Sequence, residues 1–488
     1  MPTKKNAIYR TDLLTQHMNA GKQLKVRSLL SAWRGVAVLQ GREQWKLFFT
    51  SGVISKKHDV SRTGYEVIGT SYGQMVRWQV VGQIESWLSN RSNEFRELVN
   101  SSTLDAATKH QLHFINRWQA WYKPGDLMMK DGSIITASSR KLARTIFRHL
   151  INRHGKPDLS HCSMLIDQRC IELSKASKDG AFPMWVRLST LDKGQRINIP
   201  LGSFEHFEKR NGQWAKSLQI VERDGELVFG VMTDVSEAFE KSKASYTAKT
   251  EVIGLDIGLK TLFATDQGDL LGQGWLEKLQ AYDKKINALA KHRQHIGLKP
   301  RSERYKRLVA SLRGLIRSEV GRVLNRLVQT RAPAEIIIER LNFQNSNLSR
   351  RLNRILSKFG KNEVARKLAD LEQKFGIAIT EVNPAYSSQT DSSCGYVDKR
   401  NRTRQSAFGC RWCGHKIHAD VNAARNLVAR RSGNSTDSKR PKHEILNVSV
   451  RRFLERFNRL QGGATDPRLS NPYFKDWKAK VTLIANDG

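Results

Sequence analysis

The sequence predicts an α+β protein of several domains along its 488 residues. Apolar side chains recur at helical spacing in residues 71–155 and change to a strand-like period in residues 156–240. From residue 251 onward, strand-like runs alternate with amphipathic helical segments, which favours a mixed α/β domain. The length and a hydrophobic content of 39% are sufficient for more than one core.

The chain is strongly basic, with 83 Lys and Arg against 46 Asp and Glu, a net charge of +37 and a pI of about 10.2. Such a charge favours a nucleic-acid partner over the alternative of a solvated basic surface. A membrane partner is disfavoured, because no apolar run has the length of a transmembrane helix. The N-terminus, MPTKKNAIYRTDLL, lacks the apolar core of a signal peptide.

The five cysteines are an odd number, and three of them lie close together near the C-terminus. This usage indicates a reducing compartment and a metal knuckle instead of disulfides. Cys162 and Cys170 have seven residues between them. Because that is poor spacing for metal ligands, we expect them to be buried hydrophobes or bystanders.

The first half of the chain is expected to combine a β module with helices. In residues 1–70, AWRGVAVLQGREQWKLFFTSG suggests strands or a short helix around a turn at Gly41. Residues 71–155 read as helices, the last of them basic and ending at His154-Gly155. Residues 156–240 read as antiparallel strands with a hairpin turn at Asp224-Gly225. EKSKASYTAKT, residues 240–250, reads as a polar linker.

Residues 241–390 are expected to form the mixed domain. Three strands with a turn at Gln267-Gly268 come first, followed by a basic helical hairpin over 276–330, broken at Gly297 and Pro300. The strand EIIIE, an amphipathic helix ended by Gly376 and the strand IAITEVN follow. This order suits a mixed sheet of RNase H type.

Three acids have flanks that single them out. Asp256 and Glu339 end apolar runs, VIGLD and IIIE, where an unpaired charge would be costly. Asp420 begins DVNAARNLVARR, where it could also be a plain helix N-cap. Three carboxylates together suit Mg²⁺ or Mn²⁺, and pairs of such ions hydrolyse phosphodiesters. We take these three as candidate catalytic and metal-binding acids, and expect Asp266 and Asp269, which flank a turn, to be solvated.

These segments resemble the three RuvC motifs and embedded zinc ribbon of TnpB-type transposon nucleases, which miniature type V CRISPR effectors share. The matching blocks are GLDIGLKTLFATD, IIIERLNF, VNPAYSSQT, SCGY, FGCRWCGH and HADVNAARNL. The resemblance covers residues 251–430 and implies an RNase H-like RuvC domain with Asp256, Glu339 and Asp420 as catalytic acids. It also implies a lid carried by residues 343–362.

The resemblance further implies partners and a layout. A guide RNA would pair with target double-stranded DNA while the protein reads a short adjacent duplex motif, in the cytoplasm of a prokaryote. By layout, residues 1–70 and 156–240 resemble two parts of a wedge β module, and 71–155 resembles a helical recognition insertion. The last RuvC helix would be 419–431, with a linker and C-terminal extension over 432–488.

The ribbon, residues 391–418, departs from the family pattern. The pair CRWC is intact, whereas the first pair reads DSSC, with an acid where a cysteine is expected. Four ligands make a closed zinc site. The expected Zn²⁺ ligands are Cys394, Cys410, Cys413 and Asp391. His415 or His418 could replace the acid, and the alternative is a ribbon that has lost its metal and persists as a packed loop.

Three functions are weighed. The first is an RNA-guided, Mg²⁺-dependent DNA endonuclease. The second is a guided DNA-binding protein that acts by target occupancy with little cleavage, which three intact acids disfavour. The third is a guide-free RuvC-like resolvase or transposase, which the long N-terminal half disfavours. The helical insertion and C-terminal extension favour a CRISPR-associated or intermediate form over a plain TnpB. In the extension, a helix bearing Arg451 and Arg452 is expected to face solvent, with RNA contact as the alternative.

Overall fold

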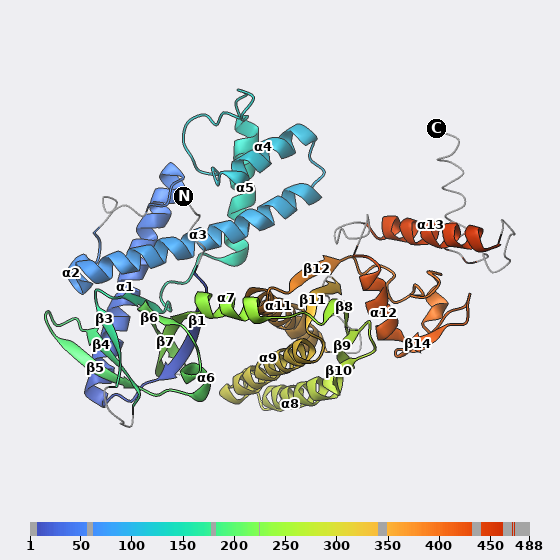
Figure 1. Cartoon of the computed structure of the whole chain (residues 1–488). Helices are drawn as coiled ribbons and strands as arrows, with labels where there is room; N and C mark the ends of the chain where they lie inside the picture. The colour runs from blue at the N-terminus through green and yellow to red at the C-terminus, as the bar shows by residue number, and fades with distance from the viewer. Residues whose placement is uncertain are drawn as a thin grey trace. The chain divides into compact units, whose positions relative to one another are not determined.

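The structure is a computed structural model of the chain. It describes residues 7–55, 62–176, 182–223, 225–339, 349–431 and 441–461, with Asn471 and Tyr473. The chain divides into two compact units, Met1–Ala238 and Phe239–Gly488. Helices and sheets occur in both units, so the predicted α+β character is confirmed (Figure 1). Among the described residues, every helix is too short or too polar to cross a lipid bilayer.

The first unit contains two antiparallel sheets, ordered β1-β7-β6-β2 and β3-β4-β5. Their strands are β1 (Tyr9–Thr15), β2 (Met164–Asp167), β3 (Ile171–Lys175), β4 (Met184–Ser189), β5 (Arg196–Leu201), β6 (Gln213–Arg223) and β7 (Glu226–Asp234). β1 pairs with β7 along its whole length, so the N-terminal strand joins strands from residues 164–234. At the predicted β6–β7 turn, Gly225 has a φ of +83°; Asp224 lies outside the described residues.

The helices of this unit are α1 (Ala20–Ser51), α2 (Tyr65–Ile68), α3 (Thr70–Ser101), α4 (Ala106–Arg117), α5 (Ala137–His154) and α6 (Glu205–Glu208). The expected turn at Gly41 is wrong, because α1 runs straight through this position. Gly41 is buried, and a Cβ there would lie 2.2 Å from Cδ1 of Leu159. The close approach of Leu159 to α1 therefore explains why a glycine occupies this position. α5 ends as predicted, with Gly155 as its C-cap.

The linker expected over residues 240–250 begins next to the boundary between the two units, but half of it is helical. α7 (Ser236–Ser245) is a helix that covers half of this stretch, and Phe239 on it is buried. The phenolic hydroxyl of Tyr246 then donates a hydrogen bond to the carbonyl oxygen of Pro333 at 2.9 Å. The buried Phe239 and the half-buried, hydrogen-bonded Tyr246 order a segment whose remaining side chains are mostly polar.

The second unit is built on a five-stranded sheet of order β10-β9-β8-β11-β12. Its strands are β8 (Thr250–Ile257), β9 (Thr261–Thr265), β10 (Leu270–Gln273), β11 (Pro333–Glu339) and β12 (Ala378–Val382). β8, β11 and β12 are parallel, whereas β9 and β10 pair antiparallel to form a meander with β8. The predicted order of strands and their mixed directions are confirmed.

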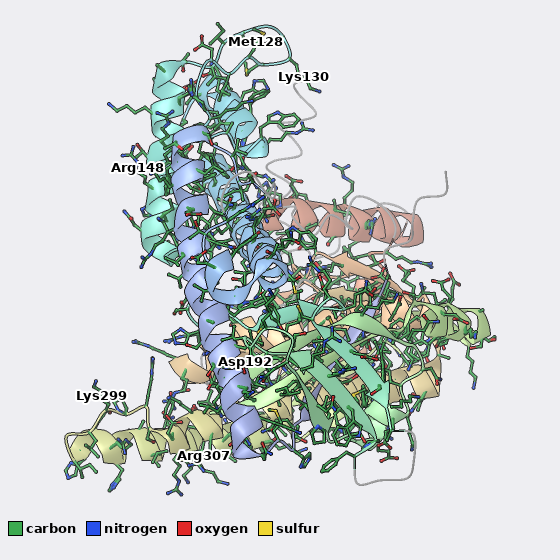
Figure 2. The ribbon with its side chains drawn as sticks, turned by 90° about the vertical axis from the view of Figure 1, so that its left-hand side faces the viewer. Met128, Lys130, Arg148, Asp192, Lys299 and Arg307 are labelled. Atoms are coloured by element: carbon green, nitrogen blue, oxygen red, sulfur yellow. The ribbon has the colours of Figure 1, made fainter. Side chains whose placement is uncertain are left out.

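The predicted hairpin of basic helices is present as α8 (Trp275–His295) and α9 (Glu303–Arg331), with Gly297 at a φ of +71° between them. One side of the hairpin packs on the core of this unit through residues such as Leu279 and Leu324. Lys299 and Arg307 project into solvent near its tip (Figure 2). The hairpin therefore has an apolar inner face and a basic outer face.

The remaining helices are α10 (Arg350–Ile355), the π-helical turn η2 (Leu356–Gly360), α11 (Lys361–Phe375), α12 (Ala419–Val428) and α13 (Lys442–Gln461). The expected lid falls partly outside the described residues, since its 343–348 portion is not among them. The ribbon contributes the short turn η3 (Lys399–Asn401) and the strands β13 (Ala407–Gly409) and β14 (Lys416–His418). α13 packs on this ribbon through Val450 and Phe453, which meet Tyr396 and Trp412.

Candidate catalytic and metal sites

Asp256 and Glu339 lie at neighbouring positions of the sheet. β8 and β11 are paired in parallel up to Leu255 opposite Ile338, and the next residue of each strand is one of the acids. Asp420 comes from the first turn of α12, and this helix packs closely on β8. A Cβ on Gly254 would lie only 2.4 Å from the carbonyl oxygen of Ala424. Glycine at this position thus brings the helix with the third acid against the strand with the first.

All three acids line one cavity of about 680 Å³ in the second unit. Burial raises the pKa of Asp256 well above its usual range, and the carboxylates of Glu339 and Asp420 raise it further. Burial also raises the pKa of Glu339, to about 7, although Arg430 opposes this rise. Mutual repulsion of clustered carboxylates is relieved by a divalent cation. Their hard oxygen donors fit Mg²⁺ or Mn²⁺.

Asp420 is not the N-cap of α12, which settles the alternative left open by the sequence. His418 is the N-cap, and its Nδ1 accepts a hydrogen bond from the backbone N–H of Asp420 at 3.3 Å. The carboxylate of Asp420 is left to face the cavity. There its Oδ1 accepts from Nη2 of Arg402 at 3.0 Å.

Arg402 lies at the candidate site, and the sequence did not reveal it. It comes from the ribbon, lines the same cavity, and also donates to the carbonyl oxygen of Gln405 at 2.6 Å. Its positive charge lowers the pKa of Asp256 against the stronger effects of burial and neighbouring acids. No local pattern distinguishes it from the other basic residues of NRTRQ, because its role depends on where the ribbon folds.

The expectation that Asp266 and Asp269 are solvated is wrong. Both are half-buried. Oδ1 of Asp266 accepts from the backbone N–H of Gly254 at 2.9 Å, and Asp269 is held by two hydrogen bonds from Arg331, at 2.7 and 2.9 Å. Neither acid lines the cavity. They brace the turn between β9 and β10, which supports leaving them out of the candidate site.

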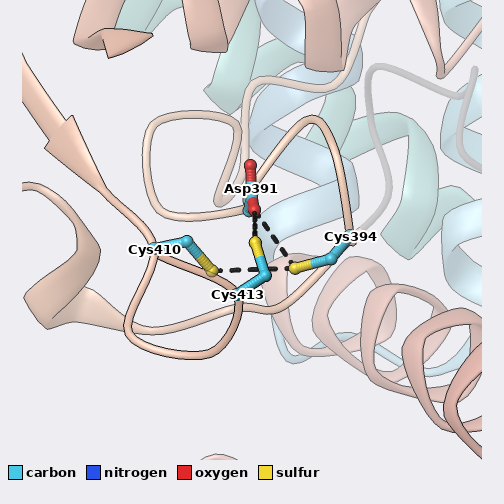
Figure 3. A group of neighbouring side chains, drawn as sticks. All are labelled: Asp391, Cys394, Cys410 and Cys413. Atoms are coloured by element: carbon cyan, nitrogen blue, oxygen red, sulfur yellow. Dashed lines mark hydrogen bonds between the residues drawn. The ribbon is translucent and has the colours of Figure 1, made fainter. Parts of the chain in front are cut away.

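The ribbon brings together the four expected ligands, Asp391, Cys394, Cys410 and Cys413, with their ligand atoms within 4.8 Å of one another (Figure 3). Oδ2 of Asp391 lies 3.1 Å from Sγ of Cys394 and 3.0 Å from Sγ of Cys413. The Sγ atoms of Cys394 and Cys410 are 3.6 Å apart. Two thiolates on one tetrahedral zinc lie about 3.8 Å apart, given Zn–S bonds of about 2.3 Å. The donor set therefore fits Zn²⁺.

Hydrogen bonds keep Asp391 ionised in spite of its burial. Burial alone would raise its pKa, but donors from Cys413, the N–H of Ser393 and His415 lower it to about 2. His415 contacts Oδ1 of Asp391 through Nδ1 at 2.8 Å. This histidine thus orients the carboxylate, and His418, as the N-cap of α12, lies outside the ligand group.

Two asparagines of α12 fasten the ribbon to the helix that carries Asp420. Nδ2 of Asn422 donates to the carbonyl oxygen of Thr390 at 2.8 Å, and its Oδ1 accepts from the N–H of Ser392 at 2.9 Å. Nδ2 of Asn426 donates to the carbonyls of Ser387 and Thr390. In the sequence, the i, i+4 spacing of these two asparagines indicates that both lie on one face of the helix, where they can bind the same neighbouring segment.

Comparisons with known proteins find one family model and several relatives that match this chain. The family "Cas12f1-like, TNB domain" matches residues 362–427. The CRISPR-associated endodeoxyribonuclease Cas12f1 of Sulfoacidibacillus thermotolerans is 37% identical over 76 residues, which are 16% of this chain and 18% of the relative. The putative RNA-guided DNA endonuclease InsQ of Escherichia coli K12 is 27% identical over 240 residues, 42% of this chain and 58% of the relative.

Among solved structures, a Cas12f1–sgRNA–target DNA complex aligns with 87% of this chain and 99% of that one, at 14% identity and a TM-score of 0.41. The chain spans less than two thirds of the length of the two curated relatives named above. The resemblance to TnpB-like and miniature type V CRISPR nucleases is confirmed by the matches to Cas12f1 and InsQ.

Proposed function

We propose that the chain is an RNA-guided DNA endonuclease whose RuvC site consists of Asp256, Glu339 and Asp420. The observation that carries the proposal is the convergence of these acids, from three separate segments, on one cavity. The three-strand meander followed by two parallel strands supports an RNase H-like RuvC domain. The relatives support the activity, since one is named an endodeoxyribonuclease and the other a putative RNA-guided DNA endonuclease.

The three acids would hold two divalent cations, Mg²⁺ or Mn²⁺. When bound, such ions supply an activated water and stabilise the leaving oxygen of the phosphodiester. The protein's part is to fix the carboxylates: β8 and β11 hold Asp256 and Glu339 rigidly, and Arg402 orients Asp420. Lys260 and Arg402 also line the cavity, where their positive charge favours entry of a phosphate.

The guide RNA and the target double-stranded DNA are proposed as partners. The basic outer face of the α8–α9 hairpin, which includes Lys299 and Arg307, offers charge for a nucleic-acid backbone. Zn²⁺ is proposed as the structural ion of the ribbon, with Asp391 in the place of a fourth thiolate. Asn422 and Asn426 then couple a metal-stabilised knuckle to the helix that positions Asp420.

The site is tested by replacing Asp256 with alanine. D256A is expected to abolish Mg²⁺-dependent cutting of DNA and to leave binding of RNA and DNA nearly intact, because the residue serves the reaction and not the fold. Glu277→Gln is the matched control, since Glu277 is an exposed acid on the rim of the same cavity. Cutting by D256A at the parent rate would contradict the assignment of the acids.

The guide is tested by the RNA that the protein retains. The gene is expressed together with its flanking DNA, the protein is purified at moderate salt, and copurifying RNA is sequenced. A defined species with repeat-derived sequence would indicate a CRISPR guide, and RNA from a transposon end would indicate a TnpB-type guide. Protein that carries no defined RNA under these conditions contradicts the guided function.

A second candidate is guided DNA binding with little cleavage. It is favoured by the hydrogen bond from Arg402, which occupies one of the two carboxylate oxygens of Asp420. Arg402→Ala separates the two functions. A rise in cutting would show that the arginine keeps the site closed, whereas a fall supports an endonuclease in which Arg402 orients Asp420. Arg400→Ala is the control, because Arg400 pairs with Asp398.

A further inference from the structure

A second cavity, of about 330 Å³, lies in the same unit between the ribbon, the end of α12 and α13. Its lining includes Asp391 and Ser392 of the first ribbon turn, Arg430 just after α12, and Arg452 of α13. The catalytic acids are absent from this lining. α13 belongs to the C-terminal extension, for which neither the sequence nor the proposed activity supplies a role.

Two arginines, Arg430 and Arg452, line this cavity. Arg430 is only 5% exposed, and its Nη1 donates to the backbone carbonyl of Asn383. Burial lowers the pKa of Arg430 to about 10, the charge of Glu339 opposes that effect, and the charge of Arg452 adds to it. Within the described ranges, neither arginine forms an ion pair with an acid. Two cations near each other, one of them buried, favour an anion between them.

The other polar groups of the lining also favour an anion. Oγ of Ser392 is buried and has no hydrogen-bond partner among the described residues, so a donor is available there. Asp391 is the one acid in the lining, and its two oxygens already accept from Cys394, Cys413, His415 and the N–H of Ser393. Both oxygens of Asp391 are thus engaged within the ribbon, and among the described residues neither forms an ion pair with Arg430 or Arg452.

We propose that this cavity binds a phosphate group of a nucleic-acid strand, held by Arg430 and Arg452 with Ser392 as a further donor. A guanidinium presents paired N–H donors that match phosphate oxygens. The choice of a strand over a free phosphate rests on the proposed function and on the net charge of +37. The C-terminal extension thereby gains a role, because α13 supplies one of the two cations.

The test compares two neighbouring arginines of α13 in the full chain. Arg452→Ala removes a cavity cation, and Arg451→Ala removes the same charge from an exposed position outside the lining. Binding of fluorescein-labelled single-stranded DNA is measured by anisotropy over a range of salt, without added divalent cations. R452A is expected to weaken binding several-fold and to reduce the slope of log K against log salt by about 0.7, the value for one phosphate contact on a single strand.

A third variant and a second ligand complete the design. Arg452→Lys is expected to keep the salt slope but lose affinity, because an ammonium lacks the paired donors of the guanidinium. Equal losses in R451A and R452A would overturn the proposal. R452A could instead leave DNA binding unchanged but abolish the thermal stabilisation given by inorganic phosphate. That result would show that the cavity binds free phosphate, and it would overturn the proposal of a nucleic-acid strand. The readout is binding alone, so a failed cleavage assay would count against the proposed function and not against this site.

Discussion

Glu339 has a raised pKa, so the stability of the metal-free protein should depend on pH through this residue. Its pKa rises from 4.5 to about 7 on folding. The folded state then binds the proton more tightly, and the resulting stabilisation is complete below about pH 4.5 and is lost as pH rises through 7. Glu339→Gln is expected to remove a pH-dependent contribution of about 3 kcal/mol between these limits.

The measurement is denaturant unfolding at several pH values without divalent cations. Added Mg²⁺ should stabilise the parent at the upper end of the range and have little effect on E339Q, because a cation replaces the proton as the partner of the carboxylate. Glu277→Gln serves as the control for loss of an acid in the same cavity. Identical pH profiles for E339Q and the parent would mean that folding does not raise the pKa of Glu339, as expected if its carboxylate is hydrated.

Asp391 is expected to be a zinc ligand and His415 only its orienting partner. Asp391→Ala should reduce bound zinc to less than about half an equivalent, since three thiolates leave a four-ligand site incomplete. His415→Ala should keep the ion but weaken its affinity about 10- to 100-fold, as outer partners of metal ligands do. Zinc is measured by mass spectrometry after challenge with a chelator, and Asp391→Cys, which restores the four-thiolate pattern, should retain the ion.

At the scale of single residues, the sequence reveals acids better than it reveals their neighbours. Asp256 and Glu339 are conspicuous because each ends a strand of apolar residues, where a charge needs a reason. Arg402 and Arg430 stand among many basic residues, and only the fold places one against Asp420 and the other near Glu339. In a basic chain, arginines beside a candidate site do not stand out from the sequence, whereas acids at the ends of apolar strands do.

At the scale of elements, α12 links the features of the second unit. Its first turn carries Asp420, its middle holds the ribbon through Asn422 and Asn426, and Arg430 follows its end at the second cavity. The helix therefore connects the ribbon knuckle, the acids and the proposed phosphate site. A substitution at any of these three places is expected to shift α12 and so to alter the geometry of the other two.

The contact of α12 with β8 can be tested at Gly254. Gly254→Ala would place a Cβ 2.4 Å from the carbonyl oxygen of Ala424, so the helix must move away from the strand. Because that movement separates Asp420 from Asp256, cleavage should fall by 100-fold or more if geometry governs the reaction as it does in other enzymes, where an error of about 1 Å costs roughly 10²-fold. The assay is the rate of DNA cutting at saturating Mg²⁺.

Gly321→Ala is the matched control for this substitution. Gly321 lies within α9, and no atom approaches the position of its Cβ within 4 Å. Alanine there should stabilise the helix by roughly 0.5–1 kcal/mol and leave the cutting rate unchanged. Full activity of G254A would show that α12 tolerates a shift, and would remove the argument that its contact with β8 sets the geometry of the acids.

The elements that the sequence predicts well are those with a clear period and clear ends. The α8–α9 hairpin is broken at Gly297, and α11 ends at Gly376, where the chain adopts positive φ. For α1 the sequence left strands or a short helix open, because its apolar residues include β-branched and aromatic side chains and because Gly41 looks like a turn. In the fold that glycine serves the close approach of Leu159, a contact with a residue far away in sequence that no local window contains.

At the scale of the whole molecule, the proposed function requires that bound nucleic acid neutralise much of the net charge of +37. Affinity of the purified protein for DNA should then fall by roughly 10³- to 10⁵-fold between about 50 and 200 mM salt, as for proteins with about 6–10 phosphate contacts. The measurement is a salt titration of DNA binding, with log K plotted against log salt. Repeating it with the D256A protein separates binding from cutting, because loss of one acid should leave the slope unchanged. A nearly flat slope would mean that the lysines and arginines are solvated, and the charge could then no longer be used as an argument for a nucleic-acid partner.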